Sequence, residues 1–160
     1  MRTTLFILLA AAAVTGCRVH YEDPPQVDES IVTLSVVPDP LRMLVTCPPG
    51  NSNCFASLDA TVTVSETAGL GGRIDFVDVI LYNVVTTRND SFVRLGADWL
   101  QQQAGTNRVE ALGRLAVRPV IEGYPFPASQ PRPQLEIRLG VRFTDDRGNE
   151  HNVTKWMPLQ

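Results

Sequence analysis

LEIRLGVRFTDDRGNEHNVTKWM, residues 135–157, contains the clearest strand pattern of the chain. Its first half places an apolar residue at every second position from Leu135 to Phe143. Because successive side chains of a strand point to opposite faces, this alternation predicts a strand with one buried face. The residues DDRGN at 145–149 predict a tight turn, and a final strand is expected to follow it. The polar residues of the first strand are expected to face water: Glu136, Arg138 and Arg142.

Further short runs with strand-like composition occur throughout the chain beyond residue 30 and are broken by turn-forming residues. Good helix formers at residues 97–104, followed by Gly105, predict one short helix. Residues 123–134 contain four prolines and predict a long crossover loop. The sequence therefore predicts an all-β protein, an antiparallel β-sandwich of seven or eight strands with one short helix. The expected strands are residues 31–37, 58–65, 73–85, 91–95, 108–112, 114–121, 134–145 and 150–157.

The run RIDFVDVILYNVV at residues 73–85 is the most apolar of these strands. Little alternation follows Phe76, which predicts a central strand covered on both faces. Asp75 and Asp78 are the exceptions. Residues three apart in a regular strand point to opposite faces, so these acids are not expected to act together as an acid–base pair.

Residues 141–156, VRFTDDRGNEHNVTKW, resemble the closing hairpin of bacterial immunoglobulin-like or fibronectin type III-like domains. The resemblance covers residues 31–158 and implies an immunoglobulin-like β-sandwich. The chain departs from the antibody pattern in two ways. Cys47 and Cys54 lie too close in the sequence to bridge two sheets, and residues 73–85 lack the tryptophan of antibody domains. An antibody-type variable domain is therefore not expected.

The first seventeen residues, MRTTLFILLAAAAVTGC, have the layout of a secretory signal peptide. Arg2 supplies a positive charge, and ten apolar residues follow from Leu5 to Val14. A helix of that length covers about 15 Å, roughly half of a ~30 Å hydrocarbon core. The segment is therefore expected to be cleaved off and not to remain as a membrane-spanning anchor.

The residues Val-Thr-Gly-Cys that end this segment, Val14 to Cys17, resemble the lipobox of bacterial lipoproteins. The resemblance implies cleavage before Cys17 and a diacylglyceryl thioether on its sulfur, which would anchor the chain to a membrane. It divides the chain into a signal peptide (1–16), a lipidated N-terminus and tether (17–30) and a β-sandwich domain (31–160). Arg18 stands where an inner-membrane lipoprotein of this family would carry Asp, which favours the outer membrane. The alternative is ordinary cleavage and a freely secreted protein.

The cysteine count agrees with lipidation, because three cysteines in an exported protein leave one odd thiol. If Cys17 carries lipid, Cys47 and Cys54 remain, and they enclose the turn-forming sequence PPGNSN. A disulfide between them is expected to contribute about 2.5 kcal/mol on the chain-entropy model. A zinc site is the competing use, but His20 and His151 lie far away in the sequence.

Composition and motifs point to a binding or structural protein. The net charge of −3 gives no basic footprint for nucleic acid. No arrangement of His, Cys, Asp, Glu or Ser matches a catalytic motif, so we expect no enzyme activity and no cofactor or metal. The leading expectation is a membrane-anchored envelope lipoprotein that binds another envelope protein or a glycan. The alternative is an accessory subunit of a secretion, pilus or outer-membrane assembly, and an enzyme comes third.

One partner site is suggested by Tyr124 and Phe126, which lie among the prolines of the expected crossover loop. Aromatic rings in such a loop can stack on a sugar or dock on a protein. The other interpretation is that both rings pack against the end of the sandwich beneath the loop. The Asp145–Asp146 pair could suggest calcium, but a hairpin turn explains it without a metal.

Overall fold

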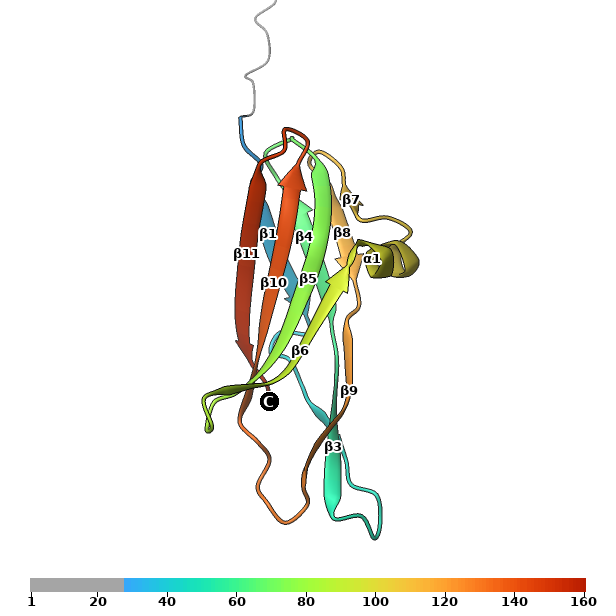
Figure 1. Ribbon diagram of the computed structural model, residues 1–160, viewed down its shortest axis with the longest axis vertical. Coiled ribbons are helices and arrows are strands. Elements are labelled where there is room, and N and C mark those ends of the chain that lie inside the picture. The colour runs from blue at the N-terminus through green and yellow to red at the C-terminus, as the bar shows by residue number, and fades with distance from the viewer. Residues whose placement is uncertain (1–27) are drawn as a thin grey trace, which may run out of the picture.

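Two antiparallel sheets face each other in the computed structural model, which describes residues 28–160 (Figure 1). One layer has the order β1-β4-β8, with β1 at Val32–Val37, β4 at Thr61–Glu66 and β8 at Arg114–Val117. The other has the order β11-β10-β5-β6, with β11 at Glu150–Pro158, β10 at Leu135–Asp145, β5 at Gly72–Asn83 and β6 at Arg88–Gly96. The short strand β7, Arg108–Val109, pairs with β5, so eight strands form the two layers of an immunoglobulin-like sandwich, within the predicted seven or eight.

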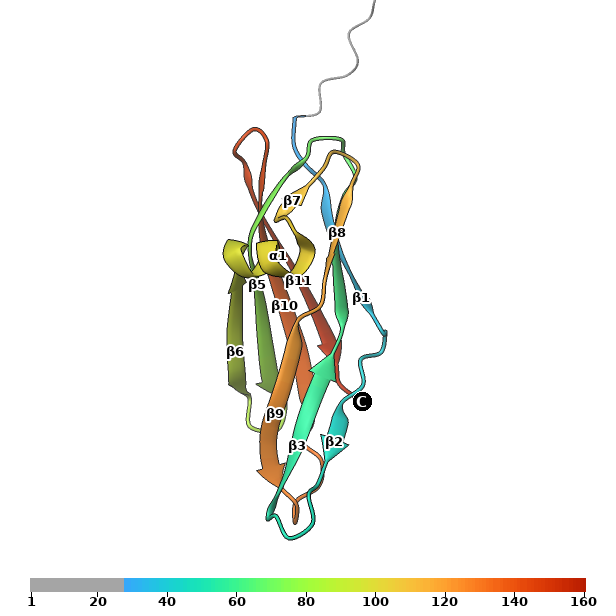
Figure 2. The same cartoon turned by 90° about the vertical axis from the view of Figure 1, so that its right-hand side faces the viewer.

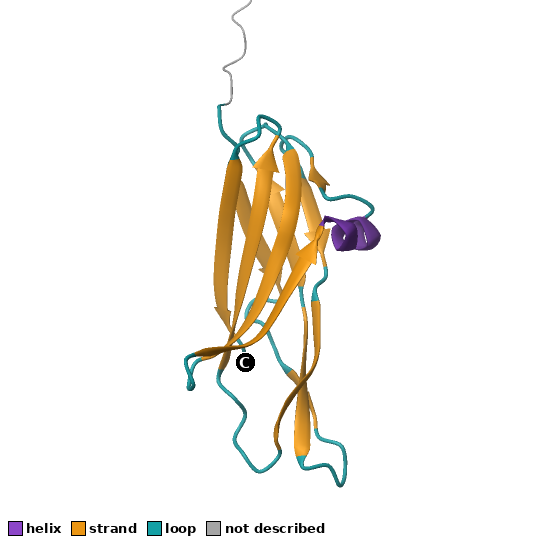
Figure 3. Cartoon of the chain, in the orientation of Figure 1, coloured by secondary structure: helices purple, strands orange, loops and turns teal. Residues whose placement is uncertain are grey.

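A third sheet lengthens the first layer, as Figure 2 shows. Its order is β2-β3-β9, with β2 at Leu44–Thr46, β3 at Asn53–Asp59 and β9 at Val120–Pro127. Only Ala60 separates β3 from β4, and two residues separate β8 from β9. Loops therefore gather at two distant ends of an elongated molecule (Figure 3).

The core lies between the inner faces of the two layers. In β10 buried residues alternate with half-buried ones along the whole strand, which confirms the predicted alternation. The buried face of β10 consists of Leu135, Ile137, Leu139, Val141 and Phe143. From the opposite layer Val62 and Val64 of β4 are fully buried in the same cluster. Removing this apolar surface from water stabilises the fold.

The predicted coverage of β5 on both faces is wrong, because only its inner face is buried. The register between β5 and β10 shifts where Arg142 pairs with Phe76 and Phe143 pairs with Ile74. Asp75 is the extra residue of this β-bulge, and a bulge changes which face the following side chains take. Asp75 and Asp78 consequently lie on the same outer face, which corrects the prediction of opposite faces.

Three predicted segments differ in extent from the strands observed. The expected strand at 114–121 divides into β8 and β9, which belong to different sheets, with Pro119 between them. The expected strand at 108–112 shortens to β7, Arg108–Val109, which pairs with β5. Residues 58–65 divide at Ala60, although their alternation of buried and half-buried positions continues through both strands.

The predicted crossover loop at 123–134 is only half correct, because its first residues form β9. In this strand Pro125 pairs with Phe55 and Pro127 with Asn53. A proline cannot donate to a neighbouring strand, and β9 is an edge strand that pairs only with β3, so both prolines are tolerated there. The loop itself is confined to residues 128–134.

The predicted helix is confirmed as α1, Ala97–Ala104. It ends at Gly105, whose φ of 73° lies in the left-handed region and whose N–H donates to the carbonyl of Gln101. Leu100 anchors the helix in the core and is fully buried. No helix within residues 28–160 is long and apolar enough to cross a membrane.

Candidate functional site

The predicted disulfide between Cys47 and Cys54 is present and closes a loop at the end of the molecule that β3 and β9 form. Cys54 is buried in a small second core with Ala56 and Phe126. The bond therefore ties the end of this arm to its own apolar cluster. Cys17, the lipobox and His20 lie outside the described residues.

Tyr124 and Phe126 lie on β9 and not in a loop, and Phe126 is more deeply buried than Tyr124. Phe126 is buried against Cys54, whereas Tyr124 is half-buried and contacts both apolar clusters. The Tyr124 hydroxyl donates to the Asp90 carboxylate at 2.6 Å. Burial and this hydrogen bond raise the pKa of Tyr124 to about 12. The bond joins β9 to β6 across the open side of the sandwich.

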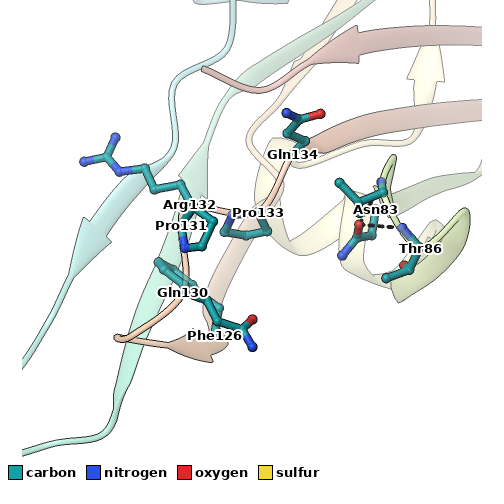
Figure 4. A pocket seen from close by; sticks show the side chains of 9 residues that line it. Asn83, Thr86, Phe126, Gln130, Pro131, Arg132, Pro133 and Gln134 are labelled. Carbon is teal, nitrogen blue, oxygen red and sulfur yellow. Dashed lines mark hydrogen bonds between the residues drawn. The ribbon is translucent and has the colours of Figure 1, made fainter.

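A cleft of about 290 Å³ lies beside Phe126, between the β5–β6 turn and the loop at 128–134 (Figure 4). Its walls combine two prolines, an aromatic edge and amide side chains, and its lining includes Asn83, Phe126, Gln130, Pro131, Pro133 and Gln134. Amides donate and accept hydrogen bonds, while the rings supply apolar area. Such a cleft suits a single side chain or a sugar ring.

Backbone hydrogen bonds hold the walls of this cleft in place. The N–H of Val84 donates to the carbonyl of Gln134 at 2.9 Å, and the N–H of Ala128 donates to the carbonyl of Ser52 at 2.8 Å. The side-chain oxygen of Asn83 accepts from the backbone N–H groups of Val85 and Thr86. The loop is thus tied to the β5–β6 turn on one side and to the loop just before β3 on the other.

The outer face of the β11-β10-β5-β6 sheet carries a second feature, an aromatic row that sequence reasoning missed. The Arg138 guanidinium lies between the Tyr82 and Trp156 rings, 3.5 and 3.7 Å from their centroids. Trp156 is 59% exposed, and Phe92 on β6 is 55% exposed. The row runs across β11, β10, β5 and β6. Arg138 of β10 is paired with Trp156 on one side and with Ile80 of β5 on the other. Ile80 is in turn paired with Phe92. Only the pairing of distant strands brings these residues together.

Three of the four arginines on this face that the structure describes are paired with acids, and Arg138 is the exception. Arg94 makes a bidentate ion pair with Asp78 and lies over the Phe76 ring at 3.9 Å. Arg142 pairs with Glu150. Arg138 has no carboxylate within 4.0 Å among residues 28–160, and its Nε has no hydrogen-bond partner there. Arg138 is therefore the face's uncompensated cation.

The β10–β11 turn is closed by Asp145, whose side chain is fully buried. It accepts hydrogen bonds from His151 Nε2 at 3.0 Å and from the backbone N–H groups of Arg147 and Asn149. Burial alone would raise the pKa of Asp145, but these hydrogen bonds outweigh burial and hold the pKa well below its usual range. His151 is packed against Phe143. The arrangement gives the pair a role in holding the hairpin.

A second buried acid, Glu66, organises the loops at the same end of the molecule. Its carboxylate accepts from the backbone N–H groups of Ala68, Gly69 and Leu112 at 2.7 to 3.1 Å. Burial opposes ionisation, but the backbone hydrogen bonds prevail and lower the pKa of Glu66. Within residues 28–160 no group of three or more His, Cys, Asp or Glu side chains is placed to hold a metal ion.

No known protein family matches the sequence, and no curated protein matches it. Two solved structures share the fold. One is an X-ray structure of a Northeast Structural Genomics Consortium target, 11% identical, with a TM-score of 0.53, covering 80% of this chain and 85% of the other. The second is a Bordetella pertussis protein that carries the provisional name ApaA, 16% identical, with a TM-score of 0.55, covering 84% and 98%. Identities this low establish a shared fold alone.

Proposed function

We propose that this protein is a membrane-anchored envelope lipoprotein that acts by binding and not by catalysis. Lipid on Cys17 would hold it to a membrane, and the outer membrane is favoured because Arg18 follows the cysteine. The β-sandwich would present the cleft beside Phe126 to an envelope protein or a glycan. The absence of basic surplus in the chain argues against nucleic acid as the partner.

One observation carries the proposal: the first described residues lie at the end of the molecule opposite the β5–β6 turn and the loop at 128–134, which line the cleft (Figure 1). The Asp28 carboxylate contacts Arg147 in the β10–β11 turn at 2.8 Å. The cleft lies at the other end, between the β5–β6 turn and the loop at 128–134. A chain anchored before residue 28 would therefore direct the cleft away from its membrane.

The chemistry of the cleft supports a small contacting group. The prolines offer apolar area at little entropic cost, because their rings are already rigid, and Phe126, itself mostly buried, lines the same cleft. The amides of Gln130 and Gln134 can bond the hydroxyls of a sugar or the backbone of a peptide. The backbone hydrogen bonds of the walls keep this arrangement formed in advance of binding.

The aromatic row favours a second candidate function, an accessory subunit of a secretion, pilus or outer-membrane assembly. Exposed tryptophan and arginine are enriched where proteins dock on each other. Trp156 and Arg138 lie together on the outer face of the sheet, and Phe92 extends the row to the edge strand β6. A face of this kind fits a protein neighbour better than a small ligand.

Photo-crosslinking in intact cells of the native host tests both candidates. A photoreactive amino acid replaces Gln130 in the cleft, Asn152 on the same sheet face as the aromatic row, or Ser35 on β1 as an exposed control. One discrete adduct from position 130, absent from position 35, supports the cleft. An adduct from position 152 alone supports the accessory subunit. Equal labelling at all three positions contradicts both.

A further inference from the structure

Two apolar side chains project into solvent at the end of the molecule opposite the cleft. Leu112 is 72% exposed and Ile31 is 59% exposed. Leu112 also has a φ of 56°, a conformation that residues with a branched side chain rarely adopt. An exposed leucine held in a strained backbone calls for an explanation beyond stability.

Buried Glu66 fixes the backbone from which both side chains project. Its carboxylate accepts from the N–H of Leu112 at 2.9 Å and from the N–H groups of Ala68 and Gly69. The adjacent residue Thr67 donates its N–H to the carbonyl of Ile31 at 2.9 Å. Hydrogen bonds therefore hold the backbone that carries both apolar side chains at one end of the sandwich.

This end is also where the described chain begins, at Asp28 (Figure 2). Ten residues lie between Cys17 and Asp28, and the eleven steps from one to the other span at most about 36 to 40 Å when fully extended. Residues 53–66 alone run about 43 Å along the sandwich, counted as thirteen steps at ~3.3 Å each. An inverted molecule, with its cleft on the membrane, would hold Asp28 farther from the bilayer than this segment reaches.

We propose that Leu112 and Ile31 form a membrane-contacting tip that inserts into the headgroup–acyl boundary of the bilayer holding the anchor. The inference rests on the proposed anchor at Cys17 and deepens it, because it defines how the domain stands on the membrane. Once the acyl chains hold the protein at the surface, the local lipid concentration is high and a small apolar contact suffices to fix the orientation.

The charges around the tip indicate which lipid it contacts. Arg108 pairs with Asp146 at 2.7 Å and with Glu110 at 3.1 Å, and Arg147 pairs with Asp28. Because acids compensate these arginines, the tip has no basic surplus to attract anionic headgroups. Insertion therefore depends on apolar contact and is as strong on zwitterionic lipid as on anionic lipid.

Site-specific fluorescence on the full lipidated protein tests the tip. Leu112→Cys carries an environment-sensitive fluorophore, and Val85→Cys at the other end, 71% exposed, is the matched control. Lipidated Cys17 and the Cys47–Cys54 disulfide leave the introduced thiol free for labelling. On phosphatidylcholine vesicles with a quencher near the headgroups, we expect a blue shift and several-fold stronger quenching at position 112 than at 85.

A second variant separates insertion from simple proximity. Leu112→Asn removes the apolar side chain, and asparagine tolerates the left-handed backbone, so the fold is preserved. With this change, quenching of a probe at Ile31→Cys should fall while flotation with vesicles is unchanged.

Two results would overturn the inference, and only the second would also overturn the proposed anchor at Cys17. Flotation with vesicles but equal quenching at positions 112 and 85 removes the tip and leaves the anchor in place. Failure of the natively processed protein to float at all removes the anchor of the proposed function and the tip that rests on it.

Discussion

The guanidinium of Arg138 lies 3.7 Å from the centroid of the Trp156 ring, on the face of the sheet that points away from the core. The Tyr82 ring covers the other side of the same cation at 3.5 Å. Arg138 thus lies on the outer face, as its place in the alternation predicts, but it is packed between rings rather than freely solvated.

Arg138→Ala should lower the free energy of unfolding by about 1 to 2 kcal/mol, because two cation–π contacts and their packing are lost. Asn152→Ala, an exposed change on the neighbouring strand, should stay within about 0.5 kcal/mol of wild type. Urea unfolding measures both. Equal effects would mean that the stacked arginine does not stabilise the sheet.

Leu139→Ala should be far more destabilising, by about 2 to 5 kcal/mol, since it leaves a cavity in the core. Leu139 is buried on the inner face of β10, one residue from Arg138. Urea unfolding again gives the values, with Asn152→Ala as the control. A loss below that of Arg138→Ala would contradict the assignment of inner and outer faces.

Acid should destabilise the protein through Glu66 and Asp145. Hydrogen bonds lower both pKa values in the folded state, so below about pH 4 the unfolded chain binds protons more readily than the folded one. The two ionised acids therefore stabilise the folded protein near neutral pH, and this stabilisation is lost as the pH falls through 4. Glu66→Gln should be less stable at pH 7 and should lose less stability between pH 7 and 3. A variant with an unchanged pH dependence would exclude Glu66 as a source of the effect.

Reducing the Cys47–Cys54 disulfide should cost about 2 to 3 kcal/mol on the chain-entropy model. The measurement is urea unfolding of the exported protein with and without a thiol reductant. A double Cys47→Ser, Cys54→Ser variant is the control and should not respond to the reductant. Reaction of both thiols with a maleimide before any reduction would contradict the bond.

The regular parts of the fold follow from the sequence because their signals are local. The apolar positions of β10, the DDRGN turn and the glycine after α1 each report the conformation of a few consecutive residues. Gly148 has a φ of 88° in the turn where glycine is expected.

Features that depend on partners far away in the chain could not be predicted. The bulge at Asp75 comes from the register between β5 and β10 and leaves no mark on composition. Pro125 and Pro127 led to the prediction of a loop, because proline is rare inside strands. That β9 is an edge strand, which tolerates proline, depends on its pairing with the distant β3 and cannot be read from the local sequence. The stack of Tyr82, Arg138 and Trp156 requires the order of three strands, and the cleft requires a turn and a loop to meet across the sheet edge.

Mass spectrometry of the mature N-terminus from native membranes decides whether Cys17 carries the proposed lipid. The proposed lipoprotein predicts a chain that begins at Cys17 and carries a diacylglyceryl group on its sulfur. The Cys17→Ser protein should then remain unprocessed at this site and lose its anchored form. A mature chain that begins with an unmodified Cys17, or a Cys17→Ser protein still cleaved after Gly16 and still found with membranes, would contradict the proposal.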